Sequence, residues 1–282
     1  MNPSWPTIAI VGVGLIGGSI GRAILGRRLA SRVIGIGRSR RSLEAALAAG
    51  AVTETALDPG AAAGADLVVV ATAVTIIPRL LEAVDKEVRP GTLLTDAGST
   101  KSSIVAAWES RRPIRRGRFV GAHPLAGSHH RGPGAADGDL FAERTVILTP
   151  AETTPRDDLE DAGRFWSALG STVKIMSPRD HDRVVAATSH APHLAAAAVA
   201  ASTPGADLPY AAGGWRDTTR IAAGDPELWA DILLDNAGPV AVAMRRILVA
   251  SERMLAAIEA GDRRRLVDLL EHAKESRDAL GS

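Results

Sequence analysis

The chain has 282 residues, of which 46% are hydrophobic, 33 are basic and 32 are acidic, so its formal net charge is +1. A packed core is expected, and the balanced charge gives no reason to expect nucleic acid or a membrane as a partner. The absence of cysteine excludes disulfides, thiolate catalysis and cysteine zinc sites. The N-terminus lacks the positive region of a signal peptide, and apolar runs such as 194–201 are shorter than a membrane span, which predicts a cytoplasmic protein.

Seven short apolar or β-branched runs predict strands in the first part of the chain. They lie at 7–11, 32–36, 67–71, 92–95, 119–121, 145–148 and 172–175. Stretches of helical length lie between most of them, at 16–29, 42–49, 76–88, 101–111 and 155–169. Apolar strands separated by helices are typical of a parallel sheet that is covered on both faces. We therefore expect an α/β fold with a doubly wound, mostly parallel sheet.

The strand pattern stops near residue 177. From 179 to 280 the sequence is rich in alanine, leucine and arginine and predicts helices, with interruptions near 202–209, 222–226 and 261. We therefore expect an α/β domain at 1–177 and an all-helical domain at 178–282. Because such helices have large apolar faces, a homodimer that forms through the helical domain is also expected.

A glycine motif, GVGLIGGS at 12–19, joins the first strand to the first helix. Gly12 allows the tight turn, Gly14 lets a pyrophosphate approach the backbone, and Gly17 lets the helix pack closely on the strand. The N-terminus of the helix offers N–H groups to the phosphates. Since the motif opens a βαβ unit, it predicts a Rossmann-type domain that binds a nicotinamide dinucleotide. The other residues assigned to the cofactor near this loop are Leu15, Ile16 and Thr72.

The end of the second strand distinguishes NAD from NADP. An enzyme that uses NAD places Asp or Glu there for the ribose hydroxyls, whereas a carboxylate would repel the 2′-phosphate of NADP. No acidic residue occurs from 15 to 42, and the strand is followed by Arg38, Ser39 and Arg40. These side chains can hold a phosphate by charge-assisted hydrogen bonds, or they can be a solvated basic start to the next helix. The pattern favours NADP and leaves NAD possible.

Polar residues gather in segments that follow strands or lie in the helical part. They read DAGSTK at 96–101, HPLAG at 123–127, SHAPH at 189–193, GGWRDTTRIA at 213–222 and DPELW at 225–229, with Asn236 beyond them. The first two follow strands, where open α/β sheets bind ligands. In this order the segments resemble the prephenate/arogenate dehydrogenase family of tyrosine biosynthesis over nearly the whole chain. The resemblance implies a Rossmann domain followed by an all-helical dimerisation domain.

The resemblance also implies a reaction and a role for each polar residue. A base removes the hydroxyl proton of prephenate or arogenate, a hydride leaves the same carbon for the nicotinamide, and loss of carbon dioxide makes the ring aromatic. The implied base is His123, because histidine titrates near operating pH, and Ser99 orients it. Arg220 is implied to bind a substrate carboxylate. The other implied substrate residues are Arg216 (lysine in many relatives), Asp217, His181, His193, Trp229 and His129.

Simpler interpretations compete with several of these roles. Arg216 and Arg220 are four residues apart and can form a solvated basic helix face. His190 can be structural, and Lys101 is expected to close its loop by hydrogen bonding rather than to do chemistry. A zinc site at the histidines is not favoured, because no acidic ligand lies at metal-site spacing.

Two other functions fit the domain layout. A β-hydroxyacid dehydrogenase has a catalytic lysine on a helix of its second domain, but the only lysine beyond residue 177 is Lys274, near the C-terminus. A non-catalytic dinucleotide sensor would need neither His123 nor Arg220. Replacement of either residue by alanine therefore distinguishes a sensor from an enzyme.

Overall fold

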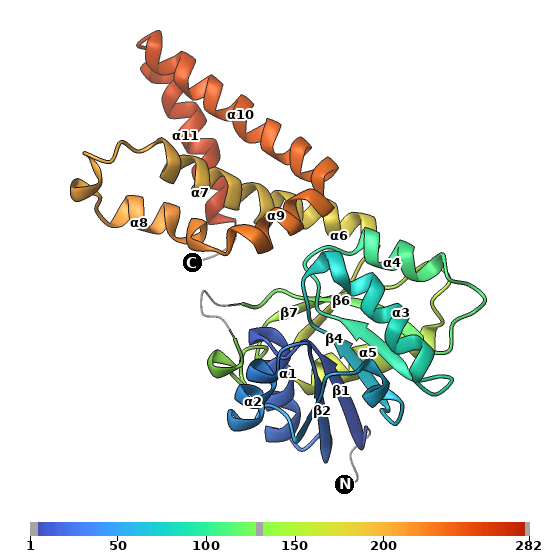
Figure 1. Cartoon of the computed structure of the whole chain (residues 1–282). Coiled ribbons are helices and arrows are strands. Elements are labelled where there is room, and N and C mark those ends of the chain that lie inside the picture. Colours follow the sequence, from blue (N-terminus) through green and yellow to red (C-terminus); the bar gives the residue numbers. More distant parts are fainter. Residues whose placement is uncertain (1–4, 128–131, 280–282) are drawn as a thin grey trace. The chain divides into compact units, whose positions relative to one another are not determined.

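The computed structural model describes residues 5–127 and 132–279 (Figure 1). Its eight strands form one sheet in the order β3-β2-β1-β4-β5-β6-β7-β8, in which every pair is parallel except β6 with β7. The strands are β1 (Thr7–Val11), β2 (Arg32–Ile36), β3 (Glu54–Ala56), β4 (Leu67–Val70), β5 (Leu93–Asp96), β6 (Arg118–Pro124), β7 (Thr145–Thr149) and β8 (Thr172–Ile175). The expected mostly parallel α/β sheet is confirmed.

Helices cover both faces of this sheet because the strands are apolar on both sides. Ile8 and Ile10 of β1 pack in one core with α1 (Leu15–Gly26), α2 (Arg40–Ala48) and α5 (Arg156–Ala168). The alternate residues Ala9 and Val11 pack in a second core with α3 (Ile77–Glu87) and α4 (Ser102–Glu109). This is the doubly wound arrangement expected for strands without a polar face.

Two strands differ from the sequence prediction. Strand β3 was not predicted, since its three residues at the sheet edge include no apolar run. Strand β6 continues beyond the predicted 119–121 as far as Pro124, because antiparallel pairing with β7 sets His123 opposite Ile147. The histidine of HPLAG therefore lies within the strand rather than after it, on backbone held by a neighbouring strand.

After β8 the chain is helical, and it divides into compact units in an interleaved way. The unit that contains the sheet, here called the nucleotide unit, runs as far as Val184 and also includes Ala223–Asn236. It thereby takes in most of α6 (Pro178–Val185) and all of α9 (Pro226–Asp235). The second, helical unit contains α7 (Ala191–Ser202), α8 (Gly213–Thr219), α10 (Ala237–Glu259) and α11 (Arg263–Asp278). The predicted domain boundary at 177 lies just after β8. The compact unit that contains the sheet instead ends at Val184, and the segment Ala223–Asn236 later returns to it.

One helical stretch is longer and more apolar than expected from the sequence. Helix α6, a π-helical turn (Ala186–His190) and α7 form a run, Pro178–Ser202, that by length and composition alone could cross a membrane. In the most apolar 18-residue part of this run, one third of the residues are buried within the protein. A core helix passes the same test, so this is weak evidence for a membrane span, and the cytoplasmic location stays a prediction.

Candidate active site

Gly12, in the loop after β1, and Gly17, in the first turn of α1, are both required by the local geometry. Gly12 has a φ of +96°, and a Cβ on it would lie 2.3 Å from the carbonyl oxygen of Ala71. A Cβ on Gly17 would lie 1.8 Å from the carbonyl oxygen of Gly12, so α1 can pack against the loop only with glycine there. These are the turn and the close packing that the glycine motif predicts.

Gly14 has a different role, because nothing lies within 4 Å of a Cβ built on it. It caps the N-terminus of α1, so the amides of Leu15 and Ile16 begin the helix beside open space. Thr72, after β4, lines the same space, and its buried Oγ1 has no hydrogen-bond partner among the described residues. An open cradle at a helix N-terminus and a buried hydroxyl that lacks a partner fit a dinucleotide.

The cradle opens into a cavity of about 420 Å³ that reaches the end of β2. Arg38 and Ser39 line it, and among its described lining residues none is acidic. The Ser39 hydroxyl also accepts a hydrogen bond from the Ser42 amide (3.3 Å) and so caps α2. Arg40 is the first residue of α2, is exposed, and does not line the cavity. The side chains of Arg38 and Ser39 therefore lie where a ribose or its 2′-phosphate would bind.

A second cavity of about 420 Å³ begins at Gly14 and lies over the ends of β1, β4 and β5. Ser99, from the loop after β5, lines it together with Asp225, Leu228 and Trp229 from the returning segment Ala223–Asn236. The nucleotide unit thus joins Ser99 and Trp229 to the glycine loop around one space. That space is suited to the reactive end of a cofactor and a small substrate.

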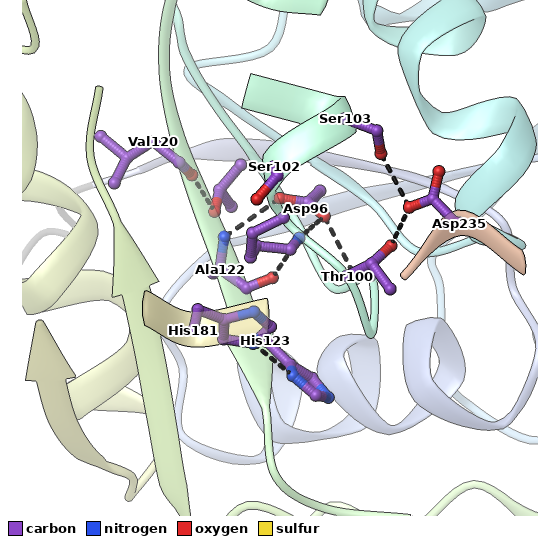
Figure 2. A network of polar contacts seen from close by, with 12 residues as sticks. Asp96, Thr100, Ser102, Ser103, Val120, Ala122, His123, His181 and Asp235 are labelled. Carbon is purple, nitrogen blue, oxygen red and sulfur yellow. Dashed lines mark hydrogen bonds and ion pairs between the residues drawn. The ribbon is translucent and has the colours of Figure 1, made fainter. Parts of the chain in front are cut away.

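A chain of hydrogen bonds starts at His123 on β6 (Figure 2). Its Nδ1 lies 2.8 Å from Nε2 of His181, and Nδ1 of His181 lies 2.8 Å from Oδ1 of Asp182. His181 and Asp182 lie on α6 and are buried, whereas His123 is half-buried.

The protonation states of His181 and Asp182 determine which atom donates in each of these hydrogen bonds. Burial lowers the pKa of His181, which favours the neutral ring. Burial opposes ionisation of Asp182, but hydrogen bonds from His181 and from the Ser102 and Lys101 amides hold its pKa below the usual range. An ionised Asp182 can only accept, so His181 donates from Nδ1 and accepts at Nε2 from Nδ1–H of His123. The Nε2 atom of His123 then carries the lone pair that a general base needs.

The strand that carries His123 is held by a buried ion pair. The Lys101 ammonium contacts the Asp96 carboxylate, and both side chains are 0% exposed. Lys101 also donates to the Ala122 carbonyl (2.9 Å), while the Ala122 amide donates to Asp96 Oδ1 (3.0 Å). The pair therefore holds both backbone groups of the residue before His123. Lys101 closes its loop by hydrogen bonding, as the sequence predicted.

The other predicted substrate residues that the structure describes, His193, Arg216, Asp217 and Arg220, lie in the helical unit. His193 is buried on α7, and burial lowers its pKa. Arg216 and Asp217 lie on α8 and Arg220 follows it, and all three side chains are exposed. His129 lies outside the described residues.

Sequence reasoning missed Asp182, although it directly follows His181. Its amide partners, Lys101 and Ser102, are about 80 positions away in the chain, so no local pattern links them to it. A carboxylate next to a candidate histidine was the one available signal.

Comparison with known proteins gives one consistent result. The model for "Prephenate dehydrogenase, nucleotide-binding domain" matches residues 20–175, and that for "Prephenate dehydrogenase, dimerization domain" matches 177–272. Prephenate dehydrogenase of Bacillus subtilis is 34% identical over 99% of this chain and 77% of its own length. A crystal structure of prephenate dehydrogenase from A. aeolicus, with hydroxyphenyl propionate and NAD+, is 29% identical with a TM-score of 0.89 and covers 97% and 98% of the two chains. Synechocystis arogenate dehydrogenase is 28% identical with a TM-score of 0.81, at 97% and 99% coverage.

Proposed function

The chain belongs to the prephenate dehydrogenase family, and we propose that it oxidatively decarboxylates prephenate, arogenate or both with a nicotinamide cofactor, in tyrosine biosynthesis. The observation that carries this proposal is the His123–His181–Asp182 chain of hydrogen bonds, which supports His123 as the base. A non-catalytic dinucleotide sensor has no need of such a base.

In this proposal the protein's own residues bind the reactants and move one proton. His123 Nε2 takes the proton of the substrate's ring hydroxyl, and Ser99, on the wall of the cavity, orients His123. The nicotinamide, when bound, accepts the hydride from the hydroxyl-bearing ring carbon. The ring then expels carbon dioxide and becomes aromatic, which makes the step irreversible.

Charged residues of the helical unit are proposed to bind the carboxylates of a dianionic substrate. Arg220 is proposed to bind a carboxylate through its planar guanidinium, with Arg216 as a second cation and Asp217 orienting them. His193, Trp229 and His129 are proposed to complete the substrate pocket. His181, predicted from the sequence to line it, is fully buried with both ring nitrogens bonded, so its proposed role is to orient His123.

NADP is proposed as the preferred cofactor. The support is that Arg38 and Ser39 line the cavity at the end of β2 with no acidic neighbour among its described lining residues, and Arg40 follows them. The test is Arg38→Ala, with the adjacent exposed Arg41→Ala as the control, since Arg41 does not line the cavity. We expect Arg38→Ala to raise the KM for NADP about 10-fold and leave that for NAD unchanged, because a charge-assisted hydrogen bond contributes ~1.5–3 kcal/mol. Equal effects of both variants would refute phosphate binding by Arg38.

The activity is tested by steady-state rates with prephenate and with arogenate, each with NAD and with NADP. We expect reduced cofactor to form with at least one pair, and His123→Asn to lower kcat by at least about 10²-fold, in the range of lost general-base catalysis. His272→Asn, on the exposed face of α11, is the matched control and is expected to leave the rate unchanged. No reaction in all four combinations would refute the substrate proposal.

A homodimer through the helical unit is also proposed. Leu255 and Ile258 on α10 and Leu270 on α11 are more than half exposed, and among the described residues of α11 none is buried. Exposed apolar side chains of this kind are typical of an interaction surface. Light scattering is expected to give twice the monomer mass, and Leu255→Asp combined with Ile258→Asp is expected to give the monomer. A wild-type monomer at micromolar concentration would refute the dimer.

A further inference from the structure

Asp182 joins the histidine chain to the end of the loop that carries Ser99. Its Oδ1 accepts from His181 Nδ1 and from the Lys101 amide, both at 2.8 Å, and its Oδ2 accepts from the Ser102 amide at 2.9 Å. Its main-chain carbonyl accepts from the side-chain amide of Asn236 at 2.8 Å. One nearly buried side chain thus touches the histidine chain and the N-terminus of α4.

The loop that ends at α4 carries Ser99, so Asp182 acts on both sides of the proposed site. Its contact with His181 sets the tautomer of that ring, and through it that of His123. Its contacts with two successive amides fix the end of the 96–101 loop. A carboxylate at a helix N-terminus is also stabilised by the helix dipole, which keeps it ionised and an acceptor only.

We propose that Asp182 is a positioning residue of the reaction, which holds His123 in the tautomer with a lone pair on Nε2 and fixes the Ser99 loop at the same time. The inference rests on the proposed function for its kinetic consequences only. Asp182 contacts neither substrate nor cofactor in this scheme, and it acts through His181.

The electrostatic surroundings define what loss of the charge does. The charged groups that act on His181 are Asp182 and Asp96, which favour its protonated form, and Lys101, which disfavours it; His123 is its hydrogen-bonded neighbour. Asp182→Asn keeps the size and removes one negative charge. Without the negative charge of Asp182, the protonated form of the histidine pair is less stable. The pKa of the acid limb of the rate profile is therefore expected to fall.

The kinetic test compares Asp182→Asn with Asp235→Asn. Asp235 binds the hydroxyls of Thr100 and Ser103 and so holds the same helix start, without touching either histidine. We expect Asp182→Asn to lower kcat at least 10-fold, to leave the KM for cofactor unchanged, and to move the acid limb of the kcat profile to lower pH. Asp235→Asn is expected to leave the acid limb in place. An unmoved limb in Asp182→Asn, or the same shift in both variants, would overturn the proposal.

A second measurement needs no turnover and is made on the unaltered Asp182. In the wild-type protein with ¹⁵N-labelled histidine, the ring nitrogen shifts report which atom carries the proton. The expected result is Nδ1–H on both His123 and His181 at pH 8, with His123→Asn and His181→Asn used for assignment. An Nε2–H ring at either position would overturn the role of Asp182. If this test succeeds while prephenate and arogenate give no rate, the positioning role stands and the substrate proposal fails.

Discussion

Replacement of Lys101 by methionine tests the buried ion pair most directly. Both Lys101 and Asp96 are fully buried, so the variant leaves a carboxylate in the core that, within residues 5–127 and 132–279, has only the Gly98 and Ala122 amides as partners. Removal of one partner of a buried pair costs about 3–5 kcal/mol. For a chain of this size that loss lowers Tm by on the order of 10 °C. Because Lys101 also holds the Ala122 carbonyl, we expect kcat to fall as well.

The assay is urea denaturation followed by circular dichroism, beside the matched variant Lys86→Met. Lys86 pairs with Glu82 at 2.9 Å on an exposed helix face, where such a pair contributes only about 0.3–0.5 kcal/mol. Asp96→Asn added to Lys101→Met removes the buried charge and is expected to restore part of the loss. A cost below about 1 kcal/mol for Lys101→Met would refute the reasoning, since a broken buried pair costs several times that.

Three further predictions concern the cofactor loop and the histidine chain. Gly12→Ala is expected to weaken cofactor binding at least 100-fold in a fluorescence titration, because its Cβ would lie 2.3 Å from the Ala71 carbonyl oxygen, while Gly26→Ala, with open space around it, is expected to bind normally. Thr72→Val is expected to raise the stability of the free enzyme by about 1 kcal/mol yet to weaken cofactor binding several-fold, since it removes a buried hydroxyl that lacks a partner; unchanged affinity would exclude contact with the cofactor. Burial lowers the pKa of His181 from 6.5, so the folded state binds fewer protons at this ring than the unfolded state does. The stability that is present above pH 6.5 is therefore lost as the pH falls through the lowered pKa. In thermal melts, His181→Asn is expected to make Tm depend less on pH over this range.

The parts of the fold that depend on local geometry were predictable from the sequence. Gly12 and Gly17 could be assigned correctly because a left-handed φ and a close helix contact each admit only glycine. The other strands were predicted as apolar runs, but β3 was missed because Glu54 and Thr55 at the sheet edge give no such run. The full length of β6 was also missed, since its last residues are strand only because β7 pairs with them.

The site was predictable only in part, because its connections are long-range. The histidines were found through motifs, but Asp182 was overlooked since its partners Lys101 and Ser102 lie far away in the sequence. The helical appearance of residues 223–236 likewise gave no sign that this segment packs with the sheet-containing unit rather than with its sequence neighbours. Periodicity identifies a helix, but tertiary contacts decide which core it joins.

That interleaved path has a consequence for how such enzymes recombine. A gene exchange at residue 177 replaces everything after β8. It therefore also replaces α6 and α9, which belong to the nucleotide unit, and with them His181, Asp182 and Trp229. A chimaera made at this position would inherit the proposed base, His123, from one parent and the groups proposed to orient it from the other. Parents of an active chimaera must therefore match at the contacts between Asp182 and the amides of Lys101 and Ser102. Among chimaeras selected for activity, we expect fewer mismatches at these contacts than at surface positions.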